Sequence, residues 1–201
     1  MNIVLASRNQ KKCEEIRYLL MPYGFDLLSV ADFPDVAEVE EMGNTFAENA
    51  ALKATEVAVA TSCWAIGEDS GLMVDALDGA PGIYSARYSG EQATDASNNM
   101  RLQVELKDIP LEKRDARYIC SIAVSDAEGN VQLAVAASCR GRIISTARGT
   151  NGFGYDPYFL IPEYHRTFGE LSPLVKQHLS HRSRAFRLLI PQLRIILRAS
   201  D

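Results

Sequence analysis

Two adjacent acidic residues in a glycine-flanked stretch are the strongest indication of chemistry in this sequence. The stretch is Gly67-Glu68-Asp69-Ser70-Gly71, preceded by the apolar run Trp64-Ala65-Ile66 and followed by Leu72-Met73-Val74. The pattern predicts that a strand ends at the acids, where the glycines let another group approach closely. Carboxylates in such a place suit magnesium-dependent phosphate chemistry. The alternative is an ordinary surface turn, because Asp, Ser and Gly are common turn residues.

A second polar stretch, from Ser7 to Lys12, lies between a predicted strand at Asn2 to Ala6 and a helical pattern at Glu14 to Leu20. A helix that starts directly after a strand presents free backbone N–H groups, which bind anions. The stretch also carries positive charge, which indicates an anionic ligand; a solvated basic turn is the alternative. Its basic residues are Arg8, Lys11 and Lys12.

A second helix start follows an acidic segment. Thr45 and Glu48 have capping-box spacing, which predicts a helix from Thr45 to about Ala60. Asn49 and Lys53 lie one turn apart on that helix and are expected to reach the same ligand. The preceding acids, which include Glu41, have a surface loop as their alternative interpretation.

The stretch from Gly149 to Pro157 places Phe153, Tyr155 and Asp156 among three glycines. Aromatic rings on a loop that permits close approach suit stacking on a nucleobase. The alternative is a glycine-rich hairpin. A β-hairpin is predicted earlier in the chain, with strands at 117–125 and 131–142 and a turn at 126–130.

The last predicted helix opens at Ser180-His181-Arg182, with Ser180 as its expected N-cap. Cations in a first helical turn oppose the helix dipole, so this start, like the one at Lys11 and Lys12, indicates an anionic or keto-bearing ligand. Pro191 is predicted to kink or split the helix.

Composition limits the class of protein. With 201 residues, 47% hydrophobic and 23% charged, the chain fits one large domain or two closely joined lobes. A net charge of −5 argues against a general nucleic-acid or membrane-surface binder. The four cysteines form no CxxC pair and are expected to be reduced core thiols. We find no signal peptide or membrane span, and therefore expect a cytoplasmic protein.

Taken together, these motifs resemble the Ham1-type inosine triphosphate pyrophosphatases, also called non-canonical purine nucleoside triphosphate pyrophosphatases. The resemblance covers nearly the whole chain. The matching stretches are Ala6 to Asn9, Gly43 to Ala50, Glu68 to Leu72, Gly79 to Gly90, Gly152 to Pro157, and Ser180 to Arg182. Three positions depart from the usual pattern, namely Lys11 in place of a glycine, Glu68 in place of a frequent Asp, and Gly169 in place of an Ala.

The resemblance implies an α/β fold with a long, curved, mixed sheet, helices in two lobes and a substrate cleft between them, within a single domain over residues 1–201. It implies a homodimeric, Mg²⁺-dependent enzyme that hydrolyses ITP, dITP and XTP to the monophosphate and pyrophosphate. Its partner is thus a purine nucleoside triphosphate rather than a nucleic acid or a membrane.

The resemblance also assigns residues. It implies that Asp69 is the central acid, as magnesium ligand or general base, that Glu41 is a further carboxylate near the metal, and that Ser70 contacts substrate. The residues implied for the triphosphate are Ser7, Arg8, Asn9, Gln10, Lys11, Lys12 and Lys53. Those implied for the nucleoside are Phe153, Gly154, Tyr155 and Asp156, with Lys176, His181 and Arg182 at the base or its 6-keto edge.

The expected chemistry is attack of water on a phosphorus of the triphosphate, which needs a divalent metal and lysines to neutralise the charge. Donors aimed at a 6-keto oxygen would reject adenine. One alternative is a Maf-like pyrophosphatase for other nucleotides, against which Lys176 and Ser180-His181-Arg182 argue. Another is a non-catalytic nucleotide sensor, which would have lost the acid that Asp69 retains.

Overall fold

The computed structural model describes residues 2–199. These residues form two compact units, each assembled from separate segments of the chain. Within the described residues, unit 1 consists of 2–69, 120–137 and 182–199, and unit 2 consists of 70–119 and 138–181.

The fold is a mixed α/β structure, as predicted. Within residues 2–199, seven strands form a sheet in the order β2-β1-β3-β4-β5-β6-β7. β1 pairs in parallel with β2 and β3, whereas β6 pairs antiparallel with β5 and β7, so the sheet is mixed. The strands are β1 (Asn2–Leu5), β2 (Asp26–Ser29), β3 (Trp64–Val74), β4 (Asp115–Ser125), β5 (Val131–Ile143), β6 (Phe159–Ile161) and β7 (Arg166–Thr167). The α-helices are α1 (Gln10–Leu20), α2 (Phe46–Thr61), α3 (Asp95–Glu105), α4 (Pro173–Leu179) and α5 (His181–Ala199).

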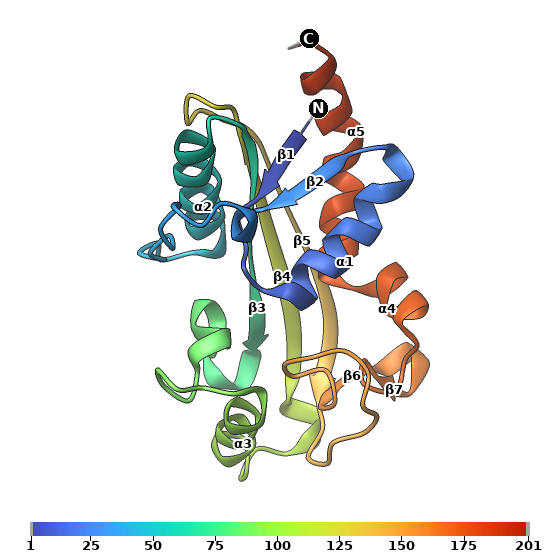
Figure 1. Cartoon of the computed structure of the whole chain (residues 1–201). Helices are drawn as coiled ribbons and strands as arrows, with labels where there is room; N and C mark the ends of the chain where they lie inside the picture. The colour runs from blue at the N-terminus through green and yellow to red at the C-terminus, as the bar shows by residue number, and fades with distance from the viewer. Residues whose placement is uncertain (1, 200–201) are drawn as a thin grey trace. The chain divides into compact units, whose positions relative to one another are not determined.

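Unit 1 has three layers. Alternation along β1 places Ile3 and Leu5 in a core with α1 and α5, whereas Val4 and Ala6 pack with α2. Figure 1 shows the same arrangement, with α2 on one side of these strands and α1 and α5 on the other. Helix α1, which follows β1 in the sequence, and helix α2, which follows β2, therefore cover opposite faces of these strands.

Unit 2 has an aromatic core. Tyr118 lies against Phe159 and Phe168, with ring centroids 4.6 Å and 6.1 Å away. Helix α3 adds Leu102 and Leu106 to the same cluster. Thr94 caps α3 and forms a capping box with Ser97.

Several predictions of local structure are confirmed. Asp126 and Asn130 close the turn between β4 and β5, and Thr45 accepts the N–H of Glu48 at the start of α2. Cys13, Cys120 and Cys139 are buried free thiols as predicted, whereas the free thiol of Cys63 is only partly buried. Among the described residues, no helix is both long and apolar enough to cross a membrane.

Two predictions are wrong. β3 does not end at the acids but runs from Trp64 to Val74 through them, because burial on both sides of the strand outweighs the low strand propensity of Gly and Asp. Helix α5 is not split at Pro191. Phe186 and Leu189 before the proline and Leu193 after it are buried in one core, so packing keeps both halves in one helix.

Candidate active site

The first three strands of unit 1 create a place where ligands bind in open α/β sheets. β1 lies between β2 and β3, and the connecting helices α1 and α2 cover opposite faces. Leu5 at the end of β1 is paired with Ile66, and the Ala6 N–H donates to the Ile66 carbonyl at 2.8 Å. Beyond this point the chain of β1 turns into α1 while β3 continues. A reversal of strand order of this kind leaves a crevice at the carboxyl ends of the strands.

Glu68 and Asp69 lie on β3 just past that pairing, and both are buried. Successive residues of a strand point to opposite faces of the sheet. Glu68 therefore faces α1 and α5, and Asp69 faces α2, as their partners show. The two acids are neighbours in sequence but belong to two different clusters.

The Glu68 cluster contains two cations. Lys12 of α1 donates to Oε2 at 2.9 Å, and Arg182 of α5 donates to Oε1 at 3.0 Å. The Cys120 thiol also donates to Oε1, at 3.3 Å, and burial, followed by the charge of Glu68, raises the pKa of that thiol well above its usual range. Arg182 is also paired with Glu15; although burial lowers its pKa, Glu68 and Glu15 raise it overall.

The Asp69 cluster contains one cation and a second acid. Lys53 of α2 donates to Oδ1 of Asp69 at 2.9 Å and lies 2.5 Å from a carboxylate oxygen of Glu41. Asn49, one turn before Lys53, donates to Oδ2 at 3.3 Å. Burial raises the pKa of Asp69, and the charge of Lys53 offsets this only in part. Burial lowers the pKa of Lys53, but Asp69 and Glu41 raise it overall.

The close approach of α2 to β3 depends on Gly67. A Cβ at this position would lie 2.0 Å from the carbonyl oxygen of Ala50, well inside contact distance. With small residues on both elements, α2 can lie near enough for Asn49 to reach Asp69. Asn49 also accepts the N–H of Gly43 at 2.8 Å, which ties the acidic segment before α2 to the same place.

The Asp69 cluster fits a hard divalent cation. Within residues 2–199 no group of three or more His, Cys, Asp or Glu side chains is arranged to hold a metal. Mg²⁺ often uses only one or two carboxylates, with water and substrate phosphates completing its shell. Asp69 and Glu41 supply two oxygen-donor side chains, and the Lys53 ammonium that they share marks a position where they already hold a positive charge.

The predicted phosphate residues lie at the start of α1. Asn9 caps the helix by accepting the N–H of Lys12 at 3.1 Å, so Lys11 and Lys12 do occupy the first turn. Lys12 is half-buried, and Arg8 is exposed and donates to the Val36 carbonyl at 2.5 Å. Ser7 accepts the N–H of Asn9 at 3.2 Å. This turn combines backbone donors with lysines at the carboxyl end of β1.

In unit 2, the predicted nucleoside residues form a second group. The Asp156 carboxylate accepts from Lys176 at 2.7 Å and from the Phe153 N–H at 2.9 Å. The Lys176 ammonium lies 4.9 Å from the centre of the Phe153 ring. His181 stacks on Tyr118 with centroids 4.7 Å apart. The structure thus brings together an aromatic ring, an acid and a lysine at the loop that was predicted to stack on a base.

Not every predicted group stays together. Glu41 lies near Asp69 as expected. Lys53, which was predicted to hold the triphosphate, pairs with both of these acids. Arg182 pairs with Glu68 and Glu15. Its contact with a base remains a prediction. The sequence patterns gave no sign of Glu15, and they indicated Glu68 only as an acid beside Asp69, not as the partner of Lys12 and Arg182. For Glu68, the alternation of β3 was an available signal, whereas 167 residues separate Glu15 from Arg182 and no spacing rule joins them.

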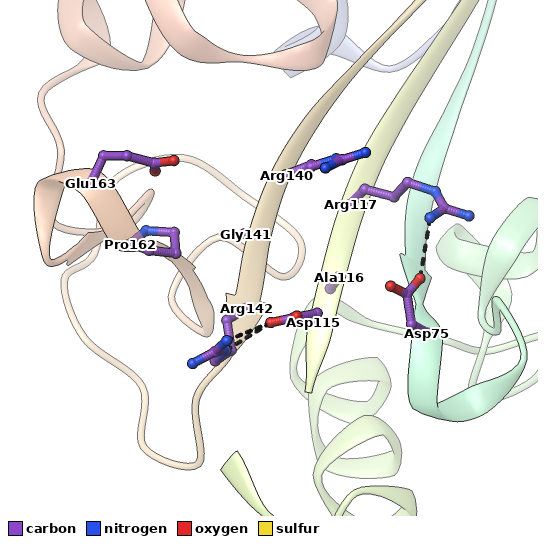
Figure 2. Close-up of a pocket in the computed structure, with 9 residues that line it drawn as sticks. All are labelled: Asp75, Asp115, Ala116, Arg117, Arg140, Gly141, Arg142, Pro162 and Glu163. Atoms are coloured by element: carbon purple, nitrogen blue, oxygen red, sulfur yellow. Dashed lines mark hydrogen bonds and ion pairs between the residues drawn. The ribbon is translucent and has the colours of Figure 1, made fainter. Parts of the chain in front are cut away.

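Unit 2 also has a pocket of about 390 Å³ that contains none of the predicted site residues (Figure 2). Arg117 pairs with Asp75 at 3.2 Å and Arg142 with Asp115 at 2.7 Å, so two of its arginines are compensated by aspartates. We therefore assign it no part in substrate binding.

This geometry defines a class of protein: α/β proteins that bind phosphorylated ligands at a reversal of strand order. The model of the Ham1 family matches residues 3–192, and the chain belongs to that family.

Similar sequences and similar solved structures support the same family assignment. A dITP/XTP pyrophosphatase of Rhodopirellula baltica is 51% identical over 96% of this chain and 92% of its own length. One of Desulforamulus reducens is 46% identical over 93% of this chain and 92% of its own. The structure of a HAM1 protein from Coxiella burnetii superposes with a TM-score of 0.88 at 38% identity, covering 96% of this chain and 98% of that one.

Proposed function

We propose that this protein hydrolyses non-canonical purine nucleoside triphosphates, namely ITP, dITP and XTP, to the monophosphate and pyrophosphate. The observation that carries the proposal is the buried Asp69, which lies midway along β3, just past the pairing of β3 with the end of β1, and shares Lys53 with Glu41. The names of the two relatives, which share about half of their residues with this chain, support the choice of substrate.

We assign to Asp69 the activation of the attacking water. Its carboxylate orients the attacking water and accepts its proton, and the raised pKa makes the carboxylate a stronger base than an exposed Asp. Asn49 holds Oδ2 in place while Lys53 contacts Oδ1. Asp69 and Glu41 are the residues that would hold Mg²⁺, which would supply charge neutralisation for the triphosphate.

The start of α1 is the part that we assign to the phosphates. The backbone N–H groups of its first turn and the ammonium groups of Lys11 and Lys12 match a polyanion in geometry and charge. Ser7, Arg8, Asn9 and Gln10 precede this turn or open it. The pairing of Lys12 with Glu68 sets the direction of its side chain before substrate arrives.

We assign recognition of the purine base to residues of unit 2. Phe153 presents a ring for stacking, and Asp156 and Lys176 present an acceptor and a donor beside it. A lysine or histidine donor pairs with the 6-keto oxygen of hypoxanthine or xanthine, but not with the 6-amino group of adenine. We include His181, Arg182, Gly154, Tyr155 and Ser70 in the proposed site on the strength of the resemblance. We likewise propose a cytoplasmic homodimer.

The test is pyrophosphate release from ITP, XTP, dITP, GTP and ATP, each with and without Mg²⁺. We expect metal-dependent release from ITP, XTP and dITP, and rates lower by several powers of ten with ATP. Equal rates on all five nucleotides would overturn the assignment of the base site. Tight binding without any release would show a nucleotide-binding protein that is not an enzyme.

A further inference from the structure

Helix α3 contacts the loop that carries Phe153 and Asp156 through both backbone polar groups of one loop residue, Gly154. Asp95 in the first turn of α3 accepts the N–H of Gly154 at 2.9 Å. Asn99, one turn later, donates to the carbonyl oxygen of the same Gly154 at 2.8 Å. The two side chains lie on one face of the helix because they are four residues apart. The backbone of Gly154 is thus fixed at its donor and at its acceptor.

The conformation that is held in this way is a special one. Gly154 has φ = +63°, in the left-handed region that residues with a Cβ rarely adopt. Asn99 is buried, and its amide also donates to the Asp95 carbonyl at 2.7 Å. Within residues 2–199 its Oδ1 has no hydrogen-bond partner, so the two donations alone orient the side chain.

The residues next to Gly154 are those that we assign to the nucleoside. The Phe153 N–H donates to Asp156, and Asp156 accepts from Lys176. On the other side, the Tyr155 hydroxyl donates to the Ser85 carbonyl at 2.8 Å. A shift of the Gly154 peptide therefore moves the Phe153 ring relative to the Asp156–Lys176 pair.

We propose that Asp95 and Asn99 are positioning residues for recognition of the nucleoside, acting through the Gly154 backbone. This rests on the proposed function of the Phe153 loop. Neither side chain is assigned a contact with substrate. Their loss is expected to let the loop move and to raise KM and weaken base selection, while kcat, which depends on Asp69, changes little.

The test compares Asp95→Ala, which removes the acceptor, with Asp95→Asn, which keeps an acceptor oxygen in the same place. Asp95 is exposed, so neither change disturbs a core. Asn99→Ala removes the second contact, and Met100→Ala is the matched control because Met100 is the next residue of α3 and is 69% exposed. The readouts are deuterium exchange of residues 150–157 without nucleotide, thermal melting, and KM, kcat and the ITP-to-ATP ratio.

We expect Asp95→Ala and Asn99→Ala to speed exchange in the loop and to raise KM for ITP by about threefold to tenfold each, the effect of losing one hydrogen bond. Asp95→Asn and Met100→Ala should remain close to the wild type. Unchanged exchange in both alanine variants would overturn the proposal. So would faster exchange with unchanged KM and selectivity, since the contact would then be merely structural.

The proposed function and the positioning role can fail independently of each other. If the wild-type protein releases no pyrophosphate from any nucleotide, that function fails, and calorimetric ITP affinity replaces KM in the comparison of variants. Faster exchange with weaker ITP binding would still support the positioning role. Should Asn99→Ala not fold, the exposed Asp95 pair of variants decides the question.

Discussion

Glu68 and Asp69 occupy adjacent positions on one strand, yet their surroundings differ in charge. On the Glu68 face, two acids, Glu68 and Glu15, meet two cations, Lys12 and Arg182, so the charges balance. On the Asp69 face, two acids, Asp69 and Glu41, both pair with the ammonium of Lys53. The central pair of the Glu68 face is the more buried one, with the Glu68 and Arg182 side chains 0% and 2% exposed, against 7% and 12% for Asp69 and Lys53. From this comparison we expect an added cation to bind on the Asp69 face, where two carboxylates lie around the Lys53 ammonium, and we expect Glu68 to contribute mainly to the stability of the fold.

The largest effect is expected at Asp69. Asp69→Asn keeps the volume of the side chain but removes the carboxylate that accepts the proton of water, so kcat should fall by about a thousandfold or more. Pyrophosphate release from ITP measures the loss. The melting temperature should stay within a few degrees of the wild type, because the change relieves the cost of burying a charge. A normal rate in this variant would remove Asp69 from the mechanism.

Glu68→Gln should have the opposite effect, which is a large loss of stability. It leaves the buried guanidinium of Arg182 with fewer compensating charges, which typically destabilises a protein by about 3–5 kcal/mol. Urea unfolding measures the free energy of unfolding. Glu105→Gln is the matched control, since the pair of Glu105 with Arg101 is much more exposed and such pairs contribute about 1 kcal/mol or less. If both variants lose equally little stability, the Glu68 cluster is not a support.

Lys53→Met is expected to give a smaller effect that depends on pH. The charge of Lys53 lowers the pKa of Asp69 against the larger effect of burial, so its removal raises that pKa further. Because the ionised carboxylate is the active form, kcat/KM falls as the pH drops through this pKa. The acidic limb of the pH profile should therefore lie at higher pH in the variant. A limb at the same pH would show that another group controls it.

Short-range patterns explain which parts of the molecule could be predicted from sequence. The cap at Thr45, the cation-rich start of α1 and the β4–β5 turn follow local rules, and each is confirmed. The continuation of β3 through Gly67 and the continuity of α5 through Pro191 do not, because distant packing overrides local propensity there.

In the site, too, contacts within one element follow local patterns, whereas contacts between distant elements do not. The spacing of Asn49 and Lys53 predicts that they reach one ligand; the structure brings both side chains to Asp69, since both belong to one helix face, and the shared ligand stays a prediction. The partners of Arg182 come from α1 and β3, and the contact of Asp95 with Gly154 joins residues 59 apart. Such contacts are set by the tertiary fold, which no local pattern encodes.

Gly67 has a consequence for how this chain can vary. Its missing side chain sets the separation of α2 from β3, and through it the reach of Asn49 and Lys53 to Asp69. A substitution there changes no charge and no contact with substrate, yet it displaces a helix that carries two partners of the central acid. Substitution at this position is thus constrained by the geometry that catalysis needs. The absence of a side chain at Gly67 is as strict a requirement as the carboxylate at Asp69.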